Sequence, residues 1–168
     1  MRGNVHIYQR SHINTDEIIP ARYLNIHDEA TLAQHAMEDI DKDFVNRIKD
    51  GDFIVAGEDF GCGSSREHAV WALRGAGVRA VLADTFARIF YRNAISNGFY
   101  AIEIPGISRK VDGGDQLEID MAGGKVTNIT KDVVYAFPPF PPMIQAIVSA
   151  GGLMNYIARQ QTGERISG

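Results

Sequence analysis

Between residues 53 and 104, short apolar runs alternate with longer helical patterns, and this alternation restricts the fold more than any other feature of the sequence. The apolar runs cover residues 53–57, 78–83 and 100–104, and the helical patterns cover residues 69–76 and 86–95. Crossovers of this length join parallel strands, because an antiparallel pair needs only a short turn. The sequence therefore predicts a mainly parallel β-α-β-α-β core. Gly75 and Gly77 are expected to end the first of its helices.

The segment before this core predicts a strand, a loop and a helix. Residues 5–8 alternate as a strand does, and residues 11–20 are predicted to form a polar loop with an apolar exit. Asp28 can cap a helix that begins near Glu29. Its apolar face is predicted to carry Leu32, Ala33, Ala36 and Met37.

The segment after the core predicts antiparallel structure and a last helix. Residues 116–121 and 125–129 flank Gly123-Gly124, which is typical of a β-hairpin. Residues 143–150 have a helical pattern and end at two further glycines. We expect one domain over residues 1–168, of the α/β class, with an antiparallel β extension.

Composition excludes several classes of function. The chain has 168 residues, a net charge of -4 and no basic stripe, so a nucleic-acid surface is not expected. No apolar run approaches the roughly 18 residues of a membrane-spanning helix, and residues 1–10 lack the apolar region of a signal peptide. We therefore expect a cytoplasmic protein without a membrane partner.

The cysteine and histidine content limits the metal chemistry that the chain can perform alone. Cys62 is the only cysteine, which excludes an intramolecular disulfide and an iron–sulfur or zinc site made of the chain's own cysteines. The five histidines show no spacing typical of metal ligands, and Cys62 is expected to be packed. We expect no metal site and no bound cofactor on this chain.

The run Gly61-Cys62-Gly63-Ser64-Ser65-Arg66-Glu67-His68-Ala69 is the strongest functional signal. It predicts a loop that leads into a helix N-terminus, where free backbone N–H groups and the helix dipole bind anions. Arg66 adds a planar fork that matches a carboxylate. The run lacks the small third residue of a dinucleotide-binding loop and the lysine of a P-loop. A carboxylate or phosphate ligand is therefore expected here.

Each residue of this site also has a purely structural interpretation. Ser64 and Glu67 match a capping box, in which the serine side chain accepts a hydrogen bond from the helix N-terminus, and Ser65 is an alternative cap. In the functional interpretation, a desolvated Ser64 that faces cations acts as a base or nucleophile. The positive charge of Arg66 is unfavourable beside the N-terminus of a helix, which suggests that Arg66 is placed there to bind an anionic ligand. The alternative is that Arg66 forms an ion pair with an acidic residue on the surface. The segment Asn14-Thr15-Asp16 forms either a simple Asx turn or a source of a hydroxyl and a carboxylate.

Arg88 and Arg92 are four residues apart in the second predicted helix of the core and therefore share a face. Like charges so close together repel, so acidic partners are expected. These partners belong either to another subunit or to a structural salt bridge.

Together, three motifs resemble those of the small subunit of 3-isopropylmalate dehydratase, a relative of aconitase. They are Asn14-Thr15-Asp16-x-Ile18-Ile19-Pro20-x-Arg22-Tyr23-Leu24, the run from Gly61 to Ala69, and the run Phe86-Ala87-Arg88-Ile89-Phe90-Tyr91-Arg92-Asn93. With Gly151-Gly152-Leu153 the resemblance covers nearly the whole chain. It implies an aconitase-like swivelling β/β/α domain that works as a free subunit.

The resemblance also implies a division of labour with a large subunit. That partner would bind a [4Fe-4S] cluster with its own cysteines, in a heterodimer or heterotetramer, and one iron would act as a Lewis acid on a small dicarboxylate. In this chain Ser64 would be the base, and Ser65 and Arg66 would bind a substrate carboxylate. Asp16, and Thr15 with it, would support the base.

The expected reaction is the removal and reversed addition of water that interconverts 2-isopropylmalate and 3-isopropylmalate in leucine biosynthesis. The resemblance places substrate choice in the loop that contains Asn25 and Ile26. Homoaconitase-like relatives carry an arginine about where Asn25 stands, so a tricarboxylate is disfavoured, and Ile26 offers apolar surface to an alkyl group. Dehydration of citramalate or 2,3-dimethylmalate stays open as an alternative, as does a non-catalytic anion-binding module.

Overall fold

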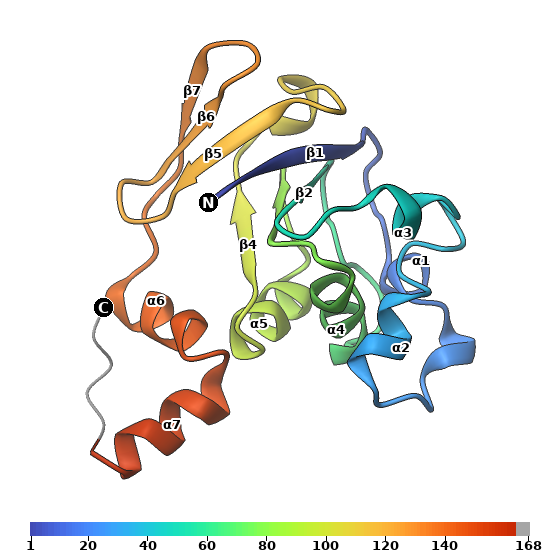
Figure 1. The fold of residues 1–168 in the computed structure, drawn as a ribbon, viewed down its shortest axis with the longest axis vertical. Helices are drawn as coiled ribbons and strands as arrows, with labels where there is room; N and C mark the ends of the chain where they lie inside the picture. The colour runs from blue at the N-terminus through green and yellow to red at the C-terminus, as the bar shows by residue number, and fades with distance from the viewer. Residues whose placement is uncertain (164–168) are drawn as a thin grey trace.

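A computed structural model describes residues 1–163, which form a seven-stranded mixed sheet flanked by helices (Figure 1). The strand order is β4-β3-β2-β1-β5-β6-β7. The strands are β1 (Arg2–Tyr8), β2 (Phe53–Ala56), β3 (Ala80–Ala83), β4 (Tyr100–Glu103), β5 (Gln116–Asp120), β6 (Lys125–Asn128) and β7 (Val133–Ala136). Strands β1 to β4 are parallel, and β5 to β7 are antiparallel.

Strand β1 joins the two halves of the sheet. Its second half pairs in parallel with β2, with Val5 opposite Phe53, while its first half pairs antiparallel with β5, with Arg2 opposite Glu118. The antiparallel strands therefore extend the sheet beyond the parallel core, which confirms the predicted α/β class with an antiparallel extension. Of the four parallel strands, β1, β2 and β3 lead into the loops that carry the candidate site, at the edge where these strands end.

Most of the helices lie below the strands in Figure 1. The longer ones are α4 (Glu67–Ala76), α5 (Arg88–Ser96), α6 (Pro142–Ser149) and α7 (Leu153–Gln161). Shorter ones are α1 (Thr15–Ile18), α2 (Glu29–Ala33) and α3 (Phe44–Arg47), with 3-10 turns η1 (Ala21–Tyr23) and η2 (Ile107–Arg109). Within residues 1–163, no helix is both long and apolar enough to cross a membrane.

Two apolar clusters fill the space on the two faces of the parallel strands. Alternation along β2 separates them: Ile54 packs with the residues of α1 to α5, whereas Phe53 and Val55 pack with β5, β6 and α6. Both faces of β2 are thus buried, which explains why residues 53–57 form a continuous apolar run rather than an alternating one.

The structure corrects several sequence predictions. Residues 11–20 are not a continuous loop, because Asn14 caps the short helix α1. The helix capped by Asp28 ends at Ala33, and Ala36 and Met37 are buried in turns beyond it. The predicted hairpin is confirmed, but it continues into a third strand, β7, whose exposed residues gave no apolar alternation.

Gly75 does not end a helix, although Gly77 does. Gly77 is the C-cap of α4 with φ of 105°. Gly75 lies inside α4, where a Cβ would come within 2.9 Å of the Glu29 carbonyl oxygen and 3.0 Å of the Ala33 Cβ. Its role is the close approach of α2 and α4, which local sequence patterns do not reveal.

Candidate functional site

The loop between β2 and α4 is fastened to the N-terminal segment by backbone hydrogen bonds. The Gly61 N–H donates to the Ile13 carbonyl at 2.8 Å, and the Thr15 N–H donates to the Cys62 carbonyl at 2.9 Å. Asn14 and Cys62 form an isolated parallel bridge. Two motifs that are about fifty residues apart in the sequence therefore lie side by side.

Thr15 connects this scaffold to Ser64. The Thr15 side chain is buried, and its hydroxyl donates to the Ser64 carbonyl oxygen at 3.0 Å. The Asn14 side chain accepts a hydrogen bond from the Glu17 N–H, three residues on, at 3.0 Å. Asn14 is therefore the N-cap of α1 and does not form the predicted Asx turn, in which the bond goes to the second residue on. Thr15 does not face solvent but fixes the backbone of Ser64.

Arg66 and Asp16 form an ion pair between the two motifs. The Arg66 guanidinium donates to a carboxylate oxygen of Asp16. The Arg66 side chain is only 17% exposed, whereas that of Asp16 is 59% exposed. One of the five guanidinium N–H groups is thereby used, and the others can bind a second carboxylate.

The two serines occupy the exposed tip of the loop and do not cap the helix. Helix α4 begins at Glu67, its N-cap is Arg66, and no side chain accepts a cap hydrogen bond there. The capping-box prediction for Ser64, and its alternative for Ser65, are therefore wrong, because the helix starts later than the motif implies. The Ser65 hydroxyl oxygen instead accepts a hydrogen bond from the Asn93 amide at 3.1 Å.

Asn93 is a site residue that sequence reasoning missed. It lies on α5 directly after Arg92, and the only local signal was its place at the end of the third motif. Its contact with Ser65 joins all three motifs of the sequence in one network. By contrast, Arg88 and Arg92 are exposed and form no ion pair within residues 1–163, so the structural salt bridge predicted as one alternative is not found there.

The segment with Asn25 and Ile26 lies between η1 and α2. Asn25 is exposed, and Ile26 is half-buried against the apolar cluster under α4. The next residue, His27, has its ring centroid 5.5 Å from that of His68 in the first turn of α4. The structure thus brings this segment against the helix that follows Ser64, although no hydrogen bond ties Asn25 to the serines in the described part of the chain.

Cys62 is the single thiol beside this network. Its burial raises its pKa, and the neighbouring carboxylates of Asp59 and Glu17 raise it further. One thiol cannot hold an iron–sulfur cluster, which takes at least two and commonly four cysteine ligands. This chain's own residues therefore do not fit such a cluster.

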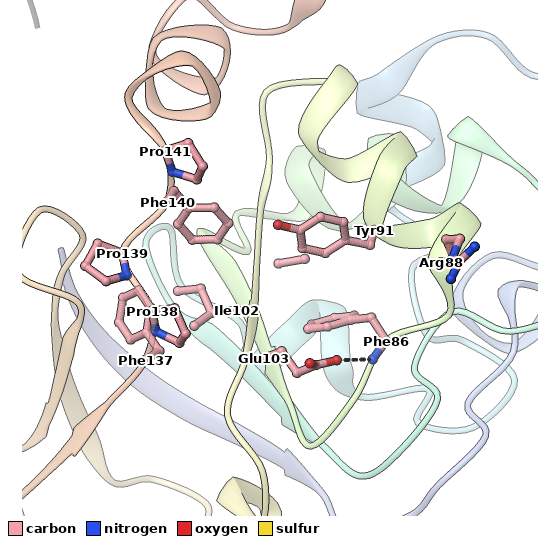
Figure 2. Close-up of a pocket in the computed structure, with 11 residues that line it drawn as sticks. Phe86, Arg88, Tyr91, Ile102, Glu103, Phe137, Pro138, Pro139, Phe140 and Pro141 are labelled. Atoms are coloured by element: carbon pink, nitrogen blue, oxygen red, sulfur yellow. Dashed lines mark hydrogen bonds between the residues drawn. The ribbon is translucent and has the colours of Figure 1, made fainter.

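A separate cavity of about 450 Å³ lies between α5, β4 and the proline-rich connector that follows β7 (Figure 2). Phe86, Tyr91, Phe137 and Phe140 line it, and the Tyr91 hydroxyl points toward Phe140. Within this cavity, the Phe86 N–H donates a hydrogen bond to the Glu103 Oε1 at 3.3 Å. Its lining is chiefly apolar, with Arg88 and Glu103 as its charged members, and it does not include the serines, Arg66 or Asp16.

The sequence is similar to those of known proteins over nearly its whole length. Residues 25–106 match the family described as the aconitase C-terminal domain. A 3-isopropylmalate dehydratase small subunit from Deinococcus deserti is 54% identical over 160 residues, which are 95% of this chain and 88% of that protein. Small subunit 2 of this enzyme from Deinococcus radiodurans is 54% identical over 164 residues, or 98% and 77% of the two chains.

A solved structure gives the same result in three dimensions. The crystal structure of 3-isopropylmalate dehydratase from Methanocaldococcus jannaschii superposes with a TM-score of 0.91 at 40% identity, covering 97% of this chain and 96% of that chain. The similarity includes both the parallel core and the antiparallel extension, since nearly the whole of each chain is covered.

Proposed function

Since the chain belongs to the family of 3-isopropylmalate dehydratase small subunits, we propose that its loop from Gly61 to Arg66 supplies the base and the carboxylate clamp of that hydro-lyase. The enzyme is a lyase of leucine biosynthesis, and its small subunit works with a large subunit. The cluster belongs to that large subunit, and when bound it supplies Lewis-acid assistance to the departing hydroxyl group. The proposed partner is this iron–sulfur large subunit, in a heterodimer or heterotetramer in the cytoplasm.

The observation that supports this proposal most strongly is the hydrogen-bond network around Ser64. Thr15 fixes the Ser64 carbonyl from the buried side, and the Arg66–Asp16 pair stands two residues further along. Ser64 is exposed, so its hydroxyl is accessible to the partner and substrate that we propose. A serine alkoxide in this position is stabilised by the N-terminus of α4 and by the Arg66 guanidinium, which lowers the cost of using it as a base.

The proton transfer in this proposal is reversible. The Ser64 alkoxide takes the proton from the carbon next to a carboxylate, the C–H electron pair becomes the second bond of an alkene, and the hydroxyl group on the neighbouring carbon leaves as hydroxide with its bonding pair. A proton from solvent converts that hydroxide to water. Addition of water in the opposite sense returns the proton to the other carbon. Ser65, positioned by Asn93, and the free N–H groups of Arg66 hold a substrate carboxylate meanwhile. Asp16 orients Arg66 and so keeps the positive charge of the guanidinium close to the base.

Asn25 and Ile26 are proposed to select the substrate. Asn25 is uncharged, so it offers no ion pair to a third carboxylate, and half-buried Ile26 presents apolar surface beside α4. Each methylene buried against such a surface contributes about 0.8 kcal/mol, or roughly fourfold in kcat/KM. We propose 2-isopropylmalate and 3-isopropylmalate as the preferred pair, with modest discrimination against smaller alkylmalates.

The test is reconstitution with the iron–sulfur large subunit and measurement of kcat/KM for 3-isopropylmalate, citramalate, 2,3-dimethylmalate and a tricarboxylate. The highest value is expected for 3-isopropylmalate. Asn25→Arg should shift the ratio of tricarboxylate to isopropylmalate by about tenfold or more, the value of a charge-assisted hydrogen bond. Preference for citramalate or 2,3-dimethylmalate in the wild-type complex would overturn the substrate assignment. An unchanged ratio in Asn25→Arg would overturn the role of the loop.

A further inference from the structure

Three potential metal ligands of different chemistry meet beside the Ser64 loop. The His12 Nδ1, a carboxylate oxygen of Asp59 and the Cys62 Sγ all lie within 4.8 Å of one another. The His12 Nδ1 is 2.9 Å from the Asp59 Oδ2. These residues come from the loop after β1 and the loop after β2, which are adjacent because the two strands pair in parallel.

Unusual backbone conformations bring two of these side chains together. Among the described residues, four that are not glycine have positive φ, and His12 at 59° and Asp59 at 56° are two of them. Such a conformation is uncommon for residues with a Cβ and costs energy unless surrounding structure supports it. The His12 N–H donates to the Glu58 carbonyl at 2.8 Å, and the Asp59 N–H donates to the Thr85 hydroxyl at 2.7 Å, so both loops are held in place.

We propose that His12, Asp59 and Cys62 bind a divalent transition-metal ion of the Zn²⁺ class, in addition to the dehydratase function. Thiolate, imidazole and carboxylate are the ligands that Zn²⁺ takes in proteins, and three of them with an open fourth position form a common arrangement. In a tetrahedral zinc site the ligand atoms are roughly 3.4–3.6 Å apart. The His12–Asp59 separation of 2.9 Å is shorter than this value, and no pair of the three ligand atoms is more than 4.8 Å apart, so the three side chains are already close to the spacing of such a site.

Charge at the site favours a cation. The Asp59 and Glu17 carboxylates both lie close enough to act electrostatically on Cys62. Arg10 pairs with Glu17, and within residues 1–163 the Asp59 carboxylate has an ion pair only with His12. On binding, the thiol gives its proton to solvent and the metal takes its place. The His12 side chain is 69% exposed, which leaves the fourth position open to water.

Occupancy of this site would act on the catalytic loop. The Cys62 carbonyl accepts the Thr15 N–H, and Ser64 follows two residues later. A metal held by Cys62 and by the two neighbouring loops would therefore restrict the movement of the segment that carries the proposed base.

The test is a Co²⁺ titration of the full chain, because a thiolate–cobalt charge-transfer band in the near ultraviolet can arise only from its single cysteine. We expect a saturable band with one Co²⁺ per chain, which Zn²⁺ displaces. His12→Asn and Asp59→Asn should each weaken binding at least tenfold, since loss of even a supporting residue costs roughly 10–100-fold in metal affinity. Asparagine tolerates positive φ, so these variants keep the backbone.

His27→Asn serves as the matched control, because it removes an exposed histidine outside the cluster and should leave the affinity unchanged. Far-ultraviolet circular dichroism checks that each variant folds. Absence of the band in the wild-type chain would overturn the proposal, as would a band whose affinity is the same in His12→Asn and Asp59→Asn as in the wild type. Neither result bears on the dehydratase activity, which is measured separately in the assembled complex.

Discussion

The two glycines that flank Cys62 share a backbone conformation but differ in their surroundings. Gly61 has φ of +84° and Gly63 has φ of +94°. A Cβ at Gly61 would lie 2.2 Å from the Phe90 Cγ, whereas the nearest atoms to a Cβ at Gly63 are 3.6 Å away. Gly61→Ala therefore adds a steric clash to a backbone penalty, and Gly63→Ala adds the backbone penalty alone.

The magnitudes follow from these distances. A left-handed conformation costs a residue with a Cβ roughly 1–2 kcal/mol. Overpacking of a well-packed core costs about 1–3 kcal/mol more. Phe90 is 2% exposed and packs against Phe60 and Phe86, so it has little room to move away. We expect losses of about 1–2 kcal/mol for Gly63→Ala and about 2–5 kcal/mol for Gly61→Ala.

Urea unfolding of the free chain measures both losses as changes in midpoint at constant slope. In a domain of this size, each kcal/mol also lowers the melting temperature by about 2–4 °C. Combining Gly61→Ala with Phe90→Leu should cost less than the sum of the two single changes, because the smaller side chain relieves the clash. Equal losses for the two glycine variants, or strict additivity with Phe90→Leu, would refute this reasoning.

Three further predictions concern the scaffold and the site. Asp52 is buried, which raises its pKa, but hydrogen bonds from His6 and two backbone N–H groups outweigh the burial and leave the pKa lowered. The ionised carboxylate should therefore stabilise the fold above about pH 4, and this contribution should be lost as the pH falls further. Asp52→Asn should flatten the acid limb of a curve of unfolding free energy against pH. Thr15→Val should cost about 1–2 kcal/mol and lower kcat, because the Ser64 carbonyl loses its donor, whereas Thr15→Ser should restore both in unfolding and steady-state assays. Arg66→Lys should lower kcat/KM by roughly 10–100-fold, since lysine lacks the planar fork; retention of wild-type kcat/KM would contradict the carboxylate role.

The sequence was most informative where the hydrophobic pattern was unambiguous. The parallel core over residues 53–104 and the hairpin after Gln116 were predicted correctly, because buried strands and their crossovers have characteristic composition and length. Strand β7 was missed, since Val133 and Val134 are both exposed and show no alternation. Gly75 was misinterpreted because its neighbours, Glu29 and Ala33, are distant in the sequence.

The candidate site was only partly predictable for a similar reason. Local pattern placed Ser64 and Arg66 before a helix, and the structure confirms that location. The Arg66–Asp16 ion pair and the Asn93–Ser65 hydrogen bond join residues that are 50 and 28 positions apart. No spacing rule connects such residues, just as none connected His12 with Asp59.

The most direct test of the central claim is kcat and KM of the Ser64→Ala variant in the assembled complex with the large subunit. Removal of the base should lower kcat by roughly 10²–10⁴-fold and leave KM nearly unchanged. Ser96→Ala, which removes an exposed hydroxyl at the end of α5, is the matched control and should retain wild-type values. A Ser64→Ala complex that turns over at the wild-type rate would contradict the assignment of Ser64 as the base.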